Sequence, residues 1–182
     1  MKNKFNISTL LVFVLVLLIG VGTTVAYIIA STRPVVNTFT VGNVELSLEE
    51  TTSNTFPIIP GSTQRKDPKV TVKAGSMNNW LFIKAEPSAD LYMYADYAIA
   101  DGWIPLEGEA NVYYRLVYQS TTDSVFNILK DNRIIIHENI TEAELELIRI
   151  NPTLNFKAYA IQMTGFYTPD DAWDAIILEK GE

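Results

Sequence analysis

The first thirty residues set the strongest limit on what this chain can fold into. Lys2 and Lys4 are followed by 28 residues without a charge, Phe5 to Thr32, and within them Leu10 to Ile19 form an unbroken apolar run. A basic start, an apolar run of this length and small residues before a cut after Ala26 are typical of a secretory signal peptide. The sequence therefore predicts that residues 1–26 enter the membrane and are removed during export.

The predicted cleavage site lies between Ala26 and Tyr27, with Ala30 as the alternative. A second interpretation stays open, because an uncharged stretch of this length could also span a bilayer of about 30 Å as an uncleaved anchor over residues 5–30. The positive-inside rule would then place the two lysines in the cytoplasm. In both cases the chain after Arg33 is predicted to lie outside the membrane, either secreted and extracellular or at the cell surface.

The size, net charge and cysteine content of the chain exclude several classes of protein. Removal of residues 1–26 leaves 156 of 182 residues, which is a normal size for one domain, with 12 basic and 21 acidic side chains and a net charge of −9. This charge argues against binding to nucleic acid or anionic lipid, because both need a basic surface. The chain has no cysteine, so disulfides and thiolate metal sites are excluded and the fold rests on its core.

Short runs with period-two alternation or continuous apolar character predict an all-β fold. We expect one antiparallel β-sandwich within residues 27–182, with the run from Trp80 to Ile83 at the centre of the core. The predicted strands are Val36–Thr40, Val44–Leu48, Lys69–Lys73, Trp80–Ile83, Asn111–Tyr118, Ser124–Leu129, Arg133–His137 and Leu154–Met163. The polar, threonine-rich stretch from Glu49 to Asn54 is predicted to be a loop, and the stretch from Gly61 to Asp67 is polar without a predicted strand.

Two short helices are predicted late in the chain. Thr141 and Glu144 have the spacing of a capping box, which predicts a helix from Glu142 to about Arg149. The sequence Thr168-Pro169-Asp170-Asp171 has a cap, a proline and acidic residues in the first turn, and it predicts the start of a final helix.

The middle of the chain is rich in tyrosine and tryptophan. Such residues in β proteins usually pack at core edges with their polar ends in water, and this is the expected role here. The alternative is a carbohydrate-binding or base-stacking platform. The residues are Tyr92, Tyr94, Tyr97, Trp103, Tyr113, Tyr114 and Tyr118.

No catalytic constellation is found in the sequence. His137 is the only histidine, and the stretch that begins His137-Glu138 has Thr141 where a zinc protease needs its second histidine. No serine has the glycines of a nucleophile elbow, and no glycine-rich phosphate loop is present. The acidic group Asp170, Asp171 and Asp174 favours a stabilised helix start over a calcium site. We therefore expect no enzyme activity, no cofactor and no bound metal.

Several segments together carry a resemblance to a known family. They are GVGTTVAY (Gly20–Tyr27), NTFTVGNVELSL (Asn37–Leu48), the Pro60-Gly61 turn, PKVTVKAGSMNNWLFIKAE (Pro68–Glu86) and LNFKAYAIQMTGF (Leu154–Phe166). In this order they resemble the camelysin and TasA-type secreted proteins, which are Gram-positive surface and biofilm-matrix proteins. The resemblance implies a SipW-type signal peptide cut by a specialised signal peptidase, a jelly-roll β-sandwich, and assembly into extracellular fibres.

The expected function is therefore that of a structural protein of the biofilm matrix. After cleavage, residues 27–36 would form an apolar segment that donates a strand to the next subunit through Tyr27, Ile28, Ile29, Val35 and Val36, with Pro34 as the hinge. Its folding back onto its own sheet is the alternative. The expected partners are copies of this chain and other matrix or surface proteins. Two rival functions remain, a ligand-binding surface module for carbohydrate or protein and, at greater distance, a camelysin-like surface metallopeptidase.

Overall fold

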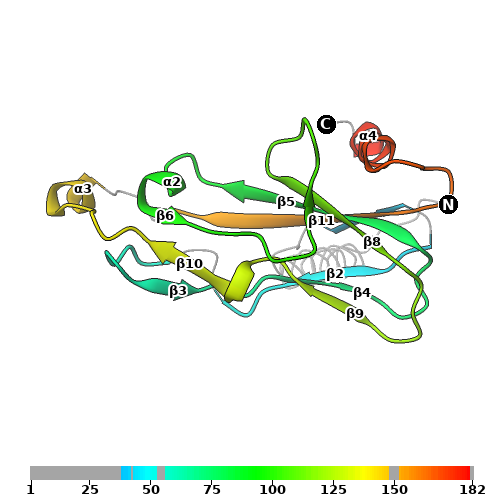
Figure 1. Cartoon of the computed structure of the whole chain (residues 1–182), viewed down its shortest axis with the longest axis horizontal. Coiled ribbons are helices and arrows are strands. Elements are labelled where there is room, and N and C mark those ends of the chain that lie inside the picture. Colours follow the sequence, from blue (N-terminus) through cyan, green and yellow to red (C-terminus); the bar gives the residue numbers. More distant parts are fainter. Residues whose placement is uncertain (1–37, 42, 53–55, 148–151, 181–182) are drawn as a thin grey trace, which may run out of the picture. The chain divides into compact units, whose positions relative to one another are not determined.

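The computed structural model describes residues 38–41, 43–52, 56–147 and 152–180. The part of the chain that it describes is mostly β, with three sheets and a few short helices, which confirms the predicted all-β class and is compatible with a β-sandwich (Figure 1). The signal segment, the cleavage site at Ala26 and Tyr27 with its alternative Ala30, and the donor residues Tyr27, Ile28, Ile29, Val35 and Val36 lie outside the described residues.

Eleven strands within the described residues form the three sheets. The five-stranded sheet has the order β1 (Thr38–Val41), β11 (Leu154–Gln162), β5 (Asn79–Pro87), β8 (Val112–Val117) and β7 (Ile104–Pro105). The β4 sheet consists of β2 (Leu46–Glu49), β4 (Lys69–Val72) and β9 (Ser124–Asn127). The β10 sheet consists of β3 (Thr63–Arg65), β10 (Arg133–Ile136) and β6 (Ala95–Asp96).

One strand pairing differs from the antiparallel prediction. β1 runs parallel to β11, with Thr38 opposite Ala158 and Val41 opposite Ile161. The other pairings between the described strands are antiparallel. Parallel neighbours need a long connection between them. The connection from β1 to β11 contains almost the whole domain, so no local hairpin signal could have set the direction of this pair.

β5 lies at the centre of the core, as the run from Trp80 to Ile83 predicts. These four residues are at most 6% exposed, because both faces of the strand are covered. Leu81 and Ile83 pack with Val70 of the β4 sheet, while Trp80 and Phe82 point to the opposite face. This alternation is the normal geometry of a strand, and it explains why an apolar run without polar interruptions is needed here.

The helix α4 (Pro169–Lys180) covers that opposite face of the five-stranded sheet (Figure 1). Trp173 is 2% exposed and contacts the rings of Phe82 and Tyr159, each at 5.3 Å between ring centroids. The Thr168 hydroxyl oxygen accepts a hydrogen bond of 3.2 Å from the backbone N–H of Asp171. This cap confirms the predicted start of the final helix.

The β10 sheet packs against the other end of β5 and β11. Ile134 and Ile136 of β10 form a core with Ala85 and Leu154. The helix α2 (Leu91–Tyr94) precedes β6, and the 3₁₀ turn η1 (Lys130–Asn132) precedes β10. Neither element was expected, and β3 lies inside the polar stretch from Gly61 to Asp67, where no strand was predicted.

The predicted helix after Thr141 is present as α3 (Glu142–Leu147), while Arg149 lies outside the described residues. The capping box is complete. The Thr141 N–H and hydroxyl each donate to a Glu144 carboxylate oxygen at 2.8 Å, and the Glu144 N–H donates back to the hydroxyl oxygen at 3.3 Å. Among the described helices, none combines the length and the apolar character needed to cross a membrane.

Candidate functional site

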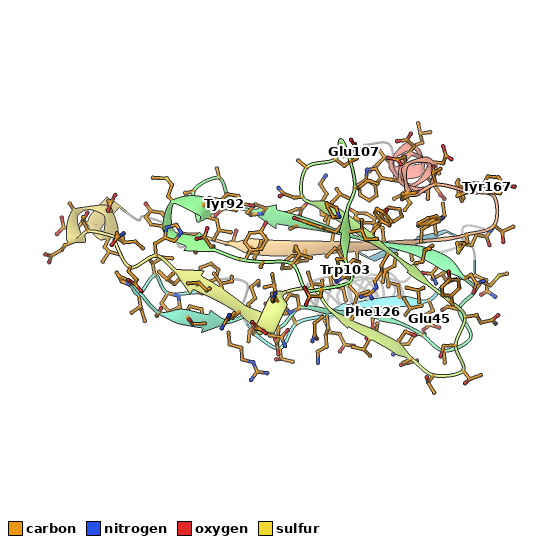
Figure 2. The ribbon with its side chains drawn as sticks, in the orientation of Figure 1. Glu45, Tyr92, Trp103, Glu107, Phe126 and Tyr167 are labelled. Carbon is orange, nitrogen blue, oxygen red and sulfur yellow. The ribbon has the colours of Figure 1, made fainter. Side chains whose placement is uncertain are left out.

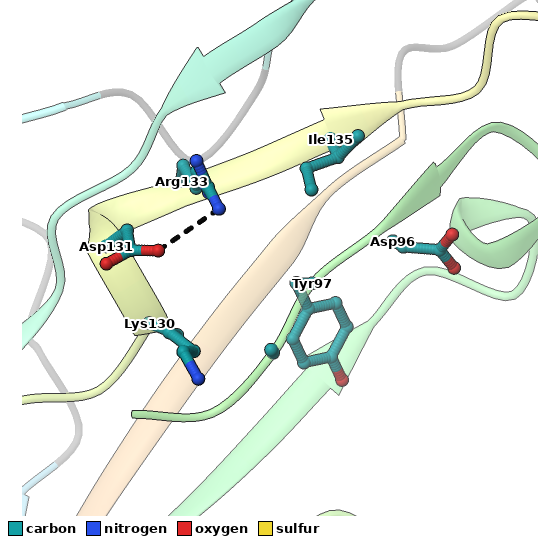
Figure 3. Close-up of a pocket in the computed structure, with 7 residues that line it drawn as sticks. Asp96, Tyr97, Lys130, Asp131, Arg133 and Ile135 are labelled. Carbon is teal, nitrogen blue, oxygen red and sulfur yellow. Dashed lines mark ion pairs between the residues drawn. The ribbon is translucent and has the colours of Figure 1, made fainter. Parts of the chain in front are cut away.

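A pocket of about 150 Å³ lies where the chain leaves β6 and passes the turn before β10 (Figure 3). One wall comes from the chain at and after the end of β6, and the other comes from η1 and β10. The backbone N–H of Lys130 donates to the carbonyl of Ala98 at 2.9 Å and joins the two walls. The lining residues are Asp96, Tyr97, Ala98, Lys130, Asp131, Arg133 and Ile135.

The η1 turn is held in an uncommon backbone conformation. Asp131 and Asn132 have φ angles of 55° and 51°, in the left-handed region that side chains other than glycine avoid. The Asn132 carbonyl accepts a 2.9 Å hydrogen bond from the N–H of Lys66, and its side-chain oxygen Oδ1 is buried without a hydrogen-bond partner. Strain and an unpaired polar atom persist where the surrounding structure fixes them, and such positions are frequent at ligand sites.

The charges of the pocket are paired rather than free. Arg133 forms an ion pair with Asp131 at 3.1 Å across the mouth of the turn (Figure 3). Lys130 lies 3.8 Å from Asp101, and both groups are largely exposed. Asp96 turns its carboxylate away from Lys130 (Figure 3) and toward His137 Nε2, at 3.0 Å. The site therefore presents donors and acceptors together.

Tyr97 and Tyr92 form the aromatic part of the site. Their rings stack with 5.9 Å between centroids and 24° between planes, and their hydroxyls are 2.8 Å apart. Burial raises the pKa of Tyr97 far above its ordinary value, and the hydrogen bond with Tyr92 adds to the shift, so its phenol stays protonated. Tyr92 is 51% exposed and extends the aromatic surface beyond the pocket.

The other predicted aromatic residues lie apart from this pocket. Tyr94 and Trp103 are buried, Tyr113 and Tyr114 are partly buried, and Tyr118 is exposed. Trp103 lies beside Phe126 (Figure 2), with its Nε1–H donating to the Asn127 carbonyl at 2.9 Å. Packing at core edges thus describes most of the group, and the Tyr92–Tyr97 pair is the part of it at the η1 pocket.

His137 lines a second pocket of about 230 Å³ with Met93, Tyr94, Asn139, Ile140 and Glu144. Its Nδ1 lies 3.3 Å from the Met93 carbonyl, and its Nε2 faces Asp96. No serine lines this pocket. Within the described residues, no group of three histidine, cysteine, aspartate or glutamate side chains could hold a metal ion. Asp170 and Asp171 lie in the first turn of α4 with Asp174 one turn later.

A different kind of site is the outer edge of β8. β7 pairs only with Tyr113 and Tyr114 and ends there, although β8 continues to Val117. The Ala85 N–H donates to the Asn111 carbonyl, and residues of an antiparallel strand alternate in the side to which their backbone groups point. In this register the N–H and C=O of Leu116 point away from β5. No described strand pairs with them there.

Arg115 precedes Leu116 on β8, and its side chain packs against the rings of Trp103 and Phe126. Its guanidinium carbon lies 3.9 Å from the centroid of the Phe126 ring and 5.2 Å from that of Trp103. Its Nε is buried without a hydrogen-bond partner, and burial lowers the pKa of the side chain. Arg65 and Arg133 each pair with a carboxylate two residues away, so Arg115 is the exception among the described arginines.

Sequence reasoning found Tyr92 and Tyr97 as members of an aromatic group but missed Lys130, Asp131 and Arg133. The one available signal was the Asp131-Asn132 pair, since both residue types tolerate the left-handed conformation better than others. Comparison with protein-family models, with curated proteins and with solved structures finds no match.

Proposed function

We propose that this protein is an exported structural subunit of an extracellular matrix, and that it assembles into fibres by adding a strand from one subunit to a sheet of the next. We also propose that the chain is a TasA-type protein and that its β-sandwich has a jelly-roll arrangement. The proposal also includes removal of residues 1–26 and donation of residues 27–36.

The observation that carries this proposal is the difference between the two edges of the five-stranded sheet. β1 forms one edge, and it follows directly after the segment proposed as the donor. β8 and the short β7 form the other edge, where the backbone of Leu116 has no described strand beside it. A donor at one edge and an acceptor at the opposite edge form a head-to-tail contact, which propagates instead of closing into a dimer.

The chemistry of the donor segment supports the same assembly. Residues 27–36 read YIIASTRPVV, with apolar and β-branched residues that suit a strand. A peptide added to a sheet edge gains affinity from backbone hydrogen bonds and specificity from alternate side chains. Leu116 and Ile104 are exposed apolar residues beside the acceptor edge and can receive such side chains.

The test uses three variants of the exported protein. Deletion of residues 27–34 removes the donor, and Leu116→Pro removes the outward N–H of the acceptor while leaving the register with β5 intact, because proline is tolerated at a strand edge. Both should give folded monomers without filaments in negative-stain microscopy and size-exclusion chromatography. A mixture of the two variants should not restore long filaments, because no subunit in it has both a donor segment and an acceptor edge.

The matched control is Val125→Pro. Val125 is 55% exposed on β9, the edge strand of the β4 sheet, and alternation from the Ile128–Pro68 hydrogen bond points its N–H outward as well. This variant should form filaments like the parent. Filaments from the deletion variant would contradict donation by residues 27–34, and filaments from Leu116→Pro would contradict the β8 edge as acceptor.

The two rival functions differ in their support. A surface metallopeptidase would show zinc at one ion per chain and proteolysis that chelation abolishes, and our proposal expects neither. A ligand-binding role has a specific observation in its favour, the stacked tyrosines beside the pocket at η1.

A further inference from the structure

We propose that the pocket between Tyr97 and the η1 turn binds one ring of a neutral saccharide. The inference does not depend on strand donation. The pocket belongs to the β10 sheet, and it shares no residue with the edge around Leu116. The pocket and the strand edge of one subunit can therefore be occupied at the same time.

The walls of the pocket match the two sides of a sugar ring. The C–H face of a pyranose is apolar and packs on an aromatic ring, and Tyr97 offers such a ring as a pocket wall. Ile135 is an exposed aliphatic group on the other wall. Tyr92 stacks on Tyr97 and fixes the orientation of its ring, so the platform exists before a ligand arrives.

The charges of the pocket favour hydroxyl groups over an anionic ligand. Arg133 is paired with Asp131 at 3.1 Å and Lys130 lies 3.8 Å from Asp101, so each cation of the lining has a carboxylate beside it. The chain as a whole has a net charge of −7, which repels acidic polymers. Guanidinium and carboxylate groups that are fixed side by side donate to and accept from neighbouring hydroxyls, a pattern that a neutral sugar satisfies.

The backbone holds these groups in place. The 2.9 Å bond from Lys130 N–H to the Ala98 carbonyl and the bond from Lys66 N–H to the Asn132 carbonyl fix both ends of η1. Their effect is to keep Asp131 in its left-handed conformation and Arg133 at the pocket mouth. A rigid site loses less entropy on binding. The volume of about 150 Å³ limits the buried part of the ligand to a single ring.

The experiment is binding of the labelled full chain to an array that carries neutral hexose oligosaccharides beside uronate-containing and sulfated ones. We expect retention on one or more neutral glycans and persistence of binding as the salt concentration rises. Arg133→Gln and Tyr97→Leu should each lower retention at least about tenfold, equivalent to 1.4 kcal/mol. Arg133 is half-exposed, so its variant should fold normally.

Lys73→Gln is the matched control. Lys73 is also a surface cation with a carboxylate partner, Asp123 at 3.1 Å, but it lies far along the chain from the pocket residues and does not line it. This variant should bind like the parent, and thermal melts of all three variants should report on folding. Retention on acidic glycans alone, no retention at all, or an Arg133→Gln variant that binds like the parent would each overturn the proposal. Because filament formation is measured separately, failure here leaves the proposed fibre function untouched.

Discussion

At the scale of single residues, the loop after β2 is tied to the start of β4 through a buried aspartate. Asp67 accepts hydrogen bonds from the backbone N–H groups of Thr51 and Thr52, at 3.1 and 3.2 Å, and from both of their hydroxyls. It also forms an ion pair with Arg65 at 3.2 Å. Donors that favour the ionised form, the Thr51 hydroxyl first among them, hold the pKa of Asp67 far below its ordinary value of 3.8.

This network predicts an acid-dependent loss of stability. Because the pKa is lower in the folded state, Asp67 contributes stability above pH 3.8, and the contribution is lost as the pH falls below that value toward the folded-state pKa. Asp67→Asn should lower the free energy of unfolding by about 1–3 kcal/mol at pH 7. Urea titrations at pH 7 and pH 2.5 test this. A difference between parent and variant that stays constant between the two pH values would contradict it.

The neighbouring Lys66 predicts an unequal pair of substitutions. Its side chain is 1% exposed and pairs with Glu50, which is 21% exposed. Glu50→Gln leaves a buried ammonium without its counter-charge and should cost about 3 kcal/mol. Lys66→Met removes the buried charge and should cost less, and the double variant should be more stable than Glu50→Gln alone. Chemical denaturation of the three variants gives the comparison, and equal effects of the two single substitutions would refute it.

At the scale of elements, α4 packs on the sheet through Ala172, Trp173 and Ile176, of which Trp173 is the largest. Trp173→Ala should reduce the free energy of unfolding by about 3–5 kcal/mol, because it removes the contacts with Phe82 and Tyr159 and leaves a cavity. Leu178→Ala on the same helix is the control. Leu178 is 81% exposed, so its loss should change stability by less than about 0.5 kcal/mol. Thermal melts followed by circular dichroism would show whether the two substitutions differ as expected.

The elements also show which parts of the fold a sequence can reveal. β5 was predicted because a strand covered on both faces needs continuous apolar residues, and the caps at Thr141 and Thr168 gave the helix starts. β3 was missed because Thr63–Arg65 is polar and largely exposed, so that pairing with β10 alone makes it a strand. The direction of β1 was wrong for a similar reason, since β11 lies more than a hundred residues away.

The pocket at η1 could not be predicted either, because its two walls come from separate segments of the chain. Tyr97 and Lys130 are brought together by the Ile99–Leu129 bridge and by the Lys130–Ala98 hydrogen bond. No sequence pattern around Tyr97 or Lys130 predicts that the two residues lie close together. The aromatic cluster was visible in the sequence, whereas the stacking of Tyr92 on Tyr97 depends on the one-turn helix α2.

At the scale of the whole molecule, export should leave a defined amino terminus. Signal peptidase cleavage after Ala26 predicts a secreted chain that starts at Tyr27, and cleavage after Ala30 predicts a start at Ser31. Terminal sequencing of the protein from culture medium distinguishes the two. Recovery of the intact chain from the membrane fraction alone would instead support the uncleaved anchor.

The parallel pairing of β1 with β11 has a mechanical consequence for a chain under tension. Four consecutive residue pairs join the strands, from Thr38 with Ala158 to Val41 with Ile161. A pull that enters at the amino end of β1 and leaves at the carboxyl end of β11 slides the two strands past each other. All the hydrogen bonds between them then share the load at once, whereas a pull across the strands would break them one at a time. A pull along this axis therefore meets the combined resistance of all four residue pairs of β1 and β11.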